Sequence, residues 1–328
     1  MTVRASRRGV LRGVGTGVLG VAALSANVAG KPGPDEPVTL FSYDPPAELP
    51  ENVAIDRRGN KYVSFPPLGE VRKITPDNET ESVLATFTTN PNDFGVLGLE
   101  VTPSGEVYAC LVTTPGADQL GVWRIGRDGS ESLYAAFPEG SFPNDILPDG
   151  DRLLVTDTTV GAVWEVREGS AVPWVVDDLL KGTGSVGFGI LLGANGIARL
   201  KDGSVVVANT EKGTLVRIPT NPDGSAGTPE QYASKPGFLF DGIAVDTRDN
   251  VYVATVGGNE ILRVTSGGFM ETLATGVDDG LSNPSDVTFG TSRGEQKDLF
   301  ITNYSVLELS APSLMKLDVG VPGAPIHR

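Results

Sequence analysis

A segment of about 45 residues recurs six times along the chain, and this period restricts the fold more than any other feature. The six copies begin at residues 51, 97, 144, 195, 241 and 285, with the segments ENVAIDRRGNKYVS, LGLEVTPSGEVYAC, NDILPDGDRLLVTD, NGIARLKDGSVVVAN, DGIAVDTRDNVYVAT and SDVTFGTSRGEQKDLFITN. A repeat of about 40 to 50 residues with four short strands is typical of a β-propeller blade. The period therefore predicts an all-β fold with six blades.

The strand signals within each copy support this interpretation. The first copy has four apolar stretches, VAID, KYVS, EVRKIT and SVLATF, separated by turn residues. The sixth copy has only three such stretches, and residues 38–43 (VTLFSY) resemble the missing fourth strand. We expect this segment to pair into the last blade and close the ring, because closure removes exposed sheet edges. A seventh blade has no room, and helical periodicity is lacking, so we predict one propeller over residues 38–328.

The N-terminal segment has the organisation of an export signal. Residues 1–30 contain paired Arg7 and Arg8, then a weakly apolar run over residues 14–24 that is too short to span a bilayer. The segment resembles a twin-arginine signal, followed by a linker at residues 31–37 (KPGPDEP). We therefore expect an exported protein without a stable membrane anchor after signal removal. A retained amphipathic or lipid-docked N-terminus is the alternative.

Composition excludes several classes of function. The chain has 26 Lys and Arg against 41 Asp and Glu, a net charge of -15, so nucleic acid is not an expected partner. Its one histidine, His327, is the penultimate residue, and its one cysteine, Cys110, lies in an apolar strand. These counts argue against Ser-His-Asp or Cys-His catalysis and against zinc sites of histidine or thiolate. The sequence leaves the oligomeric state open.

The first residues of the six copies form a candidate site. In a ring of similar blades, all inner strands begin on the same face, where these residues meet: Glu51, Leu97, Asn144, Asn195, Asp241 and Ser285. Asn and Asp are also common turn residues, which is the alternative interpretation. Converging carboxylate and amide oxygens suit a hard divalent cation. We predict a metal site of Glu51, Asn144, Asn195 and Asp241, with Ca²⁺ favoured and Mg²⁺ or Mn²⁺ as substitutes.

On these residues the chain resembles the regucalcin/gluconolactonase family of six-bladed propellers over about residues 37–320. The resemblance implies that Glu51, Asn195 and Asp241 bind the metal, and that Asn144 lies close to metal and substrate. An arginine of the family that orients sugar-like substrates corresponds here to Phe142. A ligand more apolar than a sugar acid lactone is therefore expected, in contact with Asn144 and Phe142.

The favoured function is a metal-dependent hydrolase that acts on a small-molecule lactone or related ester. Asp241 is the expected catalytic base and Glu51 the second candidate. One alternative is a non-catalytic propeller that binds a ligand or protein on the same face. Another is a metal-free pocket like that of the strictosidine synthase branch, which the presence of Glu51, Asn195 and Asp241 disfavours. The insertion KGTGSVGFGILLG, before Asn195, is either a lid or an ordinary loop.

Overall fold

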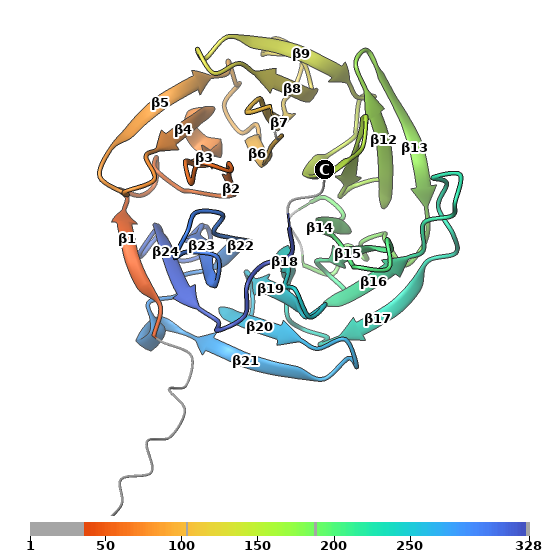
Figure 1. Ribbon diagram of the computed structural model, residues 1–328. Coiled ribbons are helices and arrows are strands. Elements are labelled where there is room, and N and C mark those ends of the chain that lie inside the picture. Colours follow the sequence, from red (N-terminus) through yellow and green to blue (C-terminus); the bar gives the residue numbers. More distant parts are fainter. Residues whose placement is uncertain (1–35, 103, 187–188, 326–328) are drawn as a thin grey trace, which may run out of the picture. The chain divides into compact units, whose positions relative to one another are not determined.

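The computed structural model describes residues 36–102, 104–186 and 189–325 of the chain. These residues form one compact unit with six antiparallel four-stranded sheets, arranged as the blades of a ring (Figure 1). The predicted six-bladed propeller is confirmed. The predicted signal, residues 1–30, and most of the predicted linker lie outside the described residues, so both stay predictions. No helix in the described ranges has the length and apolar character needed to cross a membrane.

Within each blade the strands follow one another from the centre of the ring to its rim (Figure 1). The first blade contains β2 (Val53–Ile55), β3 (Lys61–Phe65), β4 (Glu70–Ile74) and β5 (Glu81–Thr86). The second contains β6 (Gly95–Val101), β7 (Val107–Val112), β8 (Gly121–Ile125) and β9 (Glu131–Ala136). The third contains β10 (Pro143–Asp149), β11 (Arg152–Asp157), β12 (Ala162–Arg167) and β13 (Ser170–Val176).

The remaining blades repeat this pattern, with two short 3-10 helices in the connections. The fourth blade contains β14 (Ala194–Arg199), β15 (Val205–Asn209), β16 (Thr214–Ile218) and β17 (Glu230–Ser234). The fifth contains β18 (Phe240–Val245), β19 (Val251–Thr255), β20 (Glu260–Val264) and β21 (Met270–Thr275). The sixth contains β22 (Pro284–Phe289), β23 (Asp298–Asn303), β24 (Ser313–Asp318) and the N-terminal β1 (Val38–Ser42). The helices are η1 (Pro66–Leu68) and η2 (Val277–Asp279).

The N-terminal strand closes the ring as the missing fourth strand of the last repeat predicted. β1 pairs antiparallel with β24, with Val38 opposite Lys316 and Ser42 opposite Ser313. The first described strand is thereby hydrogen-bonded to the last, so backbone pairing as well as side-chain packing closes the ring. Closure of this kind protects sheet edges that an open propeller would expose.

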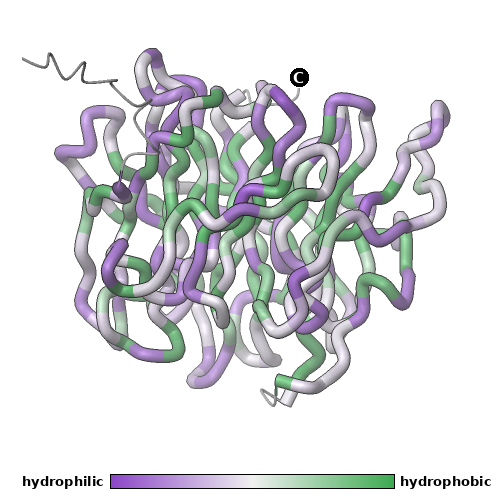
Figure 2. Tube along the Cα trace, turned by 90° about the horizontal axis from the view of Figure 1, so that it is seen from below, coloured by the Kyte–Doolittle hydropathy of each residue, from purple (hydrophilic) through white to green (hydrophobic). Residues whose placement is uncertain are grey.

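The hydrophobic core is divided among the six interfaces between neighbouring blades. Six clusters of buried apolar side chains each combine residues from two adjacent blades. The second strand of a blade is covered on both faces, which is why β7, β15 and β19 are buried along their whole length. Figure 2 shows hydrophobic stretches running through the strands and many hydrophilic stretches in the turns at their ends. Cys110 is buried within one of these interfaces.

Candidate functional site

The inner strands carry β-bulges where the sequence repeats begin. Five of them have a break in register, at Val96/Leu99, Pro143/Ile146, Ala194/Ile197, Phe240/Ile243 and Pro284/Asp286. In the first blade, Glu51 and Asn52 directly precede β2. A bulge places two residues opposite one and re-aims their side chains. Here the bulges place the first residues of the copies at one end of the central channel.

Five predicted site residues line a single cavity of about 180 Å³, which we call the entrance cavity. They are Glu51, Phe142, Asn144, Asn195 and Asp241. Leu97, the first residue of the second copy, also lines it. Ser285, the first residue of the sixth, is instead buried beside it and donates a hydrogen bond to the Glu51 carbonyl oxygen at 2.5 Å. The structure thus brings the predicted set together, while the roles of its members stay predictions.

Glu51 is held firmly by its backbone, but one of its carboxylate oxygens has no partner. Its N–H donates to the Ser64 carbonyl oxygen at 2.9 Å, and its own carbonyl oxygen also accepts from Thr302 Oγ1 at 2.8 Å. Glu51 Oε2 is buried without a hydrogen-bond partner among the described residues. Burial raises the pKa of Glu51 well above its usual range, and the negative charge of Asp241 adds to this effect. A positive charge nearby would stabilise the ionised form of this buried carboxyl group.

Asp241 and Asn195 lie on neighbouring blades beside Glu51. Asn195 lines the cavity, and its Nδ2 donates to Thr210 Oγ1 at 3.1 Å. Burial raises the pKa of Asp241 well above its usual range, the charge of Asp286 adds to the effect, and the Asn195 amide opposes it. Two carboxylates and amide oxygens therefore meet in a small space that favours their neutral forms until positive charge is supplied.

A second ring of residues, each following a predicted site position, joins the blades to one another. Its polar members accept hydrogen bonds from backbone N–H groups of the next blade: Asn52 from Leu99 at 2.9 Å, Asp145 from Ile197 at 3.0 Å, and Asp286 from Val53 at 3.0 Å. Burial also raises the pKa of Asp286, to about 6. These contacts fix the positions of the inner strands that carry the candidate ligands.

The other three members of this second ring are glycines that the next blade approaches closely. A Cβ atom would lie 2.0 Å from the Asn144 carbonyl oxygen at Gly98, 2.5 Å from that of Asp241 at Gly196, and 2.0 Å from Asp286 Oδ1 at Gly242. No side chain fits at such distances. Sequence reasoning did not identify this ring, although the second letters of the aligned dipeptides EN, LG, ND, NG, DG and SD carry its signal.

The walls of the entrance cavity are mainly apolar. They are formed by Phe94, Leu97, Phe142, Ile190, Leu192, Leu239, Val256, Val306 and Leu307, together with Tyr304. The rings of Phe94 and Phe142 pack edge to face, with centroids 4.7 Å apart. The described lining residues include no Lys, Arg or His. Ile190 and Leu192 come from the insertion before Asn195, so this segment forms part of the wall.

Tyr304 and Phe94 line both the entrance cavity and a second cavity of about 500 Å³. Burial raises the pKa of Tyr304, and the charges of Glu51 and Asp241 add to the shift. Its phenol therefore stays protonated at neutral pH and remains available as a hydrogen-bond donor. The second cavity is lined by Pro66, Pro67, Thr89, Asn90, Pro91, Asn92 and Asp93 in addition to these two aromatic residues.

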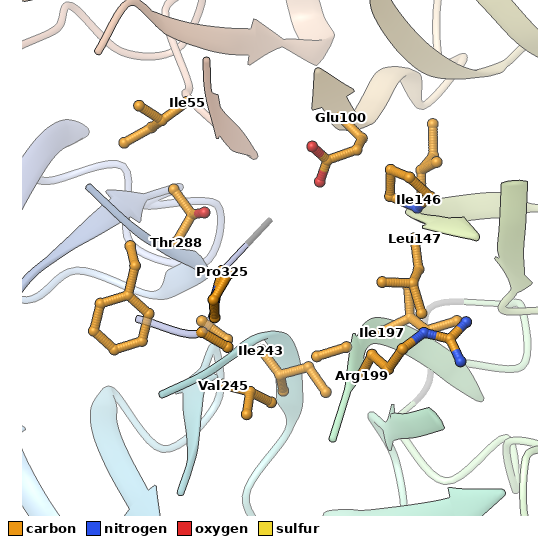
Figure 3. Close-up of a pocket in the computed structure, with 15 residues that line it drawn as sticks. Ile55, Glu100, Ile146, Leu147, Ile197, Arg199, Ile243, Val245, Thr288 and Pro325 are labelled. Atoms are coloured by element: carbon orange, nitrogen blue, oxygen red, sulfur yellow. The ribbon is translucent and has the colours of Figure 1, made fainter. Parts of the chain in front are cut away.

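At the opposite end of the inner strands lies a third cavity, of about 140 Å³ (Figure 3). Apolar residues such as Ile55 and Ile243 surround it, and the Glu100 carboxyl group points into it. Burial raises the pKa of Glu100 to about 8. Arg199 lies at the edge, but its guanidinium is paired with Asp149 at 2.8 Å. This cavity presents a single carboxyl group and lacks the converging oxygens of the entrance cavity.

The donor set of the entrance cavity fits a hard cation better than a transition metal. The described residues contain no cluster of three or more His, Cys, Asp or Glu side chains suited to a metal. The candidate set therefore depends on two carboxylates and two amides, Glu51, Asp241, Asn144 and Asn195. Oxygen donors of this kind are typical for Ca²⁺, with water completing the coordination. Among the described residues, Glu51 Oε2 has no hydrogen-bond partner and is therefore available as a ligand.

Comparison with known structures shows the same fold. A gluconolactonase from Xanthomonas campestris has a TM-score of 0.63 and 19% identity, covering 90% of this chain and 99% of its own. A calcium-binding regucalcin from Agrobacterium tumefaciens has a TM-score of 0.63 and 16% identity, with coverages of 90% and 95%. A luciferin-regenerating enzyme has a TM-score of 0.67 and 14% identity, with coverages of 89% and 98%. Identities this low establish similarity of fold alone.

The sequence itself matches one family model. No curated protein is detectably similar in sequence. Residues 186–305 match the model described as the SMP-30/Gluconolactonase/LRE-like region. This range includes Asn195 and Asp241 but neither Glu51 nor Asn144. The family resemblance predicted from the site residues over about residues 37–320 is therefore confirmed for residues 186–305.

Proposed function

We propose that the chain is a divalent-cation-dependent hydrolase of a neutral, apolar lactone or related ester. The observation that carries this proposal is the buried, unpartnered Glu51 Oε2 facing a cavity that also contains Asp241, Asn144 and Asn195. The family region at residues 186–305 and the fold shared with a gluconolactonase and a regucalcin support the same conclusion. Ca²⁺ is the proposed cation, and the predicted twin-arginine signal makes the protein an exported one.

The proposed mechanism divides binding and chemistry among the residues of the entrance cavity. Glu51, Asn144, Asn195 and Asp241 would hold the cation, which when bound supplies Lewis-acid stabilisation of negative charge on the substrate oxygen. Asp241 takes the proton of the attacking water, and Glu51 is the second carboxylate able to do so. The apolar wall excludes bulk water and strengthens each of these electrostatic contacts. The Tyr304 phenol is a further donor toward the developing oxyanion.

The walls also support the proposed substrate class. Phe142 occupies the position where the family resemblance implies an arginine, and it packs against Phe94 at the mouth. A polar sugar acid would lose hydrogen bonds with water there without replacement. The cavity beyond Phe94 and Tyr304 offers room for a substituent on the lactone. An alkyl- or aryl-substituted lactone is therefore preferred over gluconolactone.

The test compares Asp241→Asn with a surface control, Asp223→Asn. Asp223 is exposed and hydrogen-bonds Ser225 within its turn, so its replacement leaves the cavity intact. Calcium binding is measured by calorimetry, and turnover is measured on an alkyl-substituted γ-lactone, an aryl ester and gluconolactone. We expect the wild type and the control to bind calcium and hydrolyse the apolar lactone, and Asp241→Asn to do neither. Turnover that survives in Asp241→Asn or in chelator would refute the proposal.

A non-catalytic binding propeller is the second candidate. It is favoured by the low polarity of the cavity wall, where the described residues provide two carboxylates and no Lys, Arg or His. This alternative predicts calcium binding and tight retention of an apolar ligand, with no turnover of any lactone or ester in the panel. The same calorimetry and assays separate the two functions.

A further inference from the structure

A pocket of about 230 Å³ lies between the first and second blades, at the opposite end of the strands from the entrance cavity. We call it the turn pocket, because it is lined by residues in or next to the strand turns: Asp56, Arg57, Arg58, Asn60, Tyr62, Lys73, Thr102, Gly105 and Arg127. Residues 56–60 follow β2, whereas Glu51 precedes it. The length of the inner strand thus separates this pocket from the proposed catalytic residues.

The turn pocket concentrates positive charge in an acidic protein. Four of its lining residues, Arg57, Arg58, Lys73 and Arg127, are cationic, although the chain has a net charge of -15. Within the described part of the chain, none of these four forms an ion pair with a carboxylate. Arg57, Arg58 and Arg127 are exposed. Like charges at one pocket repel each other, and an anion between them removes that repulsion.

The carboxylate that lines the pocket is already saturated by its own turn. Asp56 Oδ1 accepts from the backbone N–H groups of Arg58 at 2.8 Å and Asn60 at 2.9 Å. Its Oδ2 accepts from Asn60 Nδ2 at 2.7 Å and from the Tyr62 hydroxyl at 3.3 Å. Burial and the charge of Asp56 raise the pKa of Tyr62 to about 12, which keeps this phenol a donor. Asp56 therefore stabilises the turn and is not committed to any of the four cations.

The same turn recurs in the fifth blade, but there the cation on the neighbouring strand forms an ion pair with a carboxylate. Residues 56–62 (DRRGNKY) correspond to residues 246–252 (DTRDNVY), and Asp246 makes the matching contacts to its turn. Arg263 stands opposite Tyr252 in the sheet and pairs with Glu271 on the next strand.

In the first blade the corresponding cation, Lys73, has no carboxylate partner among the described residues, and its Nζ lies over the Tyr62 ring at 5.9 Å from the centroid. Lys73 stands opposite Tyr62, and the residue opposite Lys73 on the next strand is the neutral Ser82. The turn motif therefore does not require an unpaired cation, because the fifth blade forms it with a neutralised one. What distinguishes the first blade is the missing carboxylate and the additional guanidinium of Arg127 from the second blade.

Arg127 is positioned by the turn beneath it. Its Nη2 donates to the Ser104 carbonyl oxygen, and a Cβ atom at Gly105 would lie 2.8 Å from its Nε and Nη2 atoms. The absence of a side chain at Gly105 thus lets the guanidinium lie against the backbone. Asp128, the next residue, accepts from Ser130 N and Oγ through its Oδ1. Part of the Arg127 fork remains available to a ligand.

We propose that the turn pocket binds a phosphate group, either free or on a phosphorylated molecule. Guanidinium forks match the oxygens of tetrahedral oxyanions and form strong charge-assisted hydrogen bonds with them. Arg58 and Arg127 line the pocket from two different blades, and Lys73 supplies a third positive charge to the lining. This site is independent of the proposed hydrolase activity, and its position at the opposite end of the strands allows both ligands to be bound together.

The test is calorimetric titration of the full chain with inorganic phosphate at low ionic strength in calcium-free buffer. The variant is Arg58→Gln combined with Arg127→Gln, and the matched control is Arg248→Gln, the equivalent exposed arginine of the fifth-blade turn. We expect equal phosphate binding by wild type and control, and at least about tenfold weaker binding by the double variant. Equal melting temperatures of the three proteins establish that the double variant is folded.

A second arm identifies the source of the phosphate group. The same proteins are mixed with vesicles of phosphatidylglycerol, and with phosphatidylcholine vesicles as a control for adsorption. Phosphate binding lost in the double variant supports a soluble ligand, whereas loss of binding to phosphatidylglycerol vesicles alone supports a lipid headgroup. The proposal is overturned if the wild type binds neither probe, or if the double variant binds as the wild type does.

Discussion

Replacing Glu51 by Gln should stabilise the protein without calcium and destabilise it, relative to the wild type, with calcium. Glu51 Oε2 is buried and unpartnered, and the neighbouring Asp241 carboxylate repels its charge. Gln keeps the volume of the side chain and removes that charge. A buried carboxyl group whose pKa is raised by one pH unit destabilises the fold by about 1.4 kcal/mol at neutral pH, and Gln, which is uncharged at every pH, removes a cost of at least about this size. We therefore expect Glu51→Gln to unfold in chelator with a free energy higher by about this amount.

Calcium should reverse the order of the two proteins. A ligand that binds only the folded state at a concentration one hundred times its Kd adds about 2.7 kcal/mol to stability. The wild type gains this amount, and the variant, without one proposed ligand, gains little. In a domain of this size, 1 kcal/mol corresponds to a change of about 2 to 4 °C in Tm. The crossing of the two stability curves is therefore large enough to measure.

The assay is urea unfolding followed by circular dichroism, with chelator and with calcium at fixed ionic strength. Glu139→Gln is the control, because Glu139 is exposed and its replacement makes the same change in net charge. We expect this control to behave as the wild type in both buffers. The interpretation of Glu51 Oε2 as a calcium ligand is wrong if Glu51→Gln is less stable than the wild type in chelator. It is also wrong if calcium raises the free energy of unfolding of both proteins equally.

Three further predictions concern the channel. Asp145→Ala removes the acceptor for the buried Ile197 N–H and should lower the free energy of unfolding by about 2 kcal/mol in urea titrations. Gly242→Ala should lower it by about 1 to 3 kcal/mol or prevent folding, because its Cβ would lie 2.0 Å from Asp286 Oδ1. The folded state raises the pKa of Glu100 from 4.5 to about 8, so it binds this proton more tightly than the unfolded chain. The free energy of unfolding of the wild type should therefore decrease as the pH rises from 4.5 to about 8, by up to about 1.4 kcal/mol per pH unit. Glu100→Gln should lack this contribution when unfolding is measured at pH 5, 7 and 9.

Each of these variants has a control that distinguishes the proposed interaction from a nonspecific effect of the substitution on stability. Asp145→Asn keeps an acceptor, so it should retain most of the stability that Asp145→Ala loses. Gly267→Ala places a Cβ no closer than 3.9 Å to Thr265 Oγ1 and should be tolerated. Parallel pH curves for Glu100→Gln and the wild type would contradict the account of Glu100, as would equal effects within either of the other pairs.

The fold could be predicted from the sequence because every blade uses the same local pattern. The spacing of the six copies fixed the number of blades, and the missing fourth strand of the last copy identified residues 38–43 as the closing strand. Both inferences use strand and turn signals that are repeated, so errors in one copy are corrected by the others. The observed pairing of β1 with β24 follows from the same count.

The candidate site could be predicted only in part. Alignment brought Glu51, Asn195 and Asp241 to one face because the first positions of the inner strands are equivalent by symmetry. Asn144, Asn195 and Asp241 lie in bulges of their inner strands, and the hydrophobic pattern of the sequence alone does not reveal these bulges. Phe94 and Tyr304 lie outside the aligned segments, in connections whose conformation depends on tertiary contacts. The walls of the cavity, on which the proposed substrate preference rests, therefore required the structure.

The second ring of residues explains why the carboxyl groups of Glu51 and Asp241 stay close together in the entrance cavity. Asp145 and Asp286 use their oxygens to join blades, and Gly196 lets the next blade approach the site closely. These contacts hold the inner strands at fixed separations, so Glu51 and Asp241 cannot move apart to reduce their repulsion. A neutral apolar ester carries no net charge that these two carboxylates could repel as it enters the cavity. In the proposed reaction, hydrolysis of this ester yields a carboxylate anion, which meets Glu51 and Asp241 and, among the described lining residues, no cationic side chain. The repulsion by the two acids opposes the attraction of this product to the proposed cation, so we expect the product to be held less tightly than in a site that also contains a Lys or Arg.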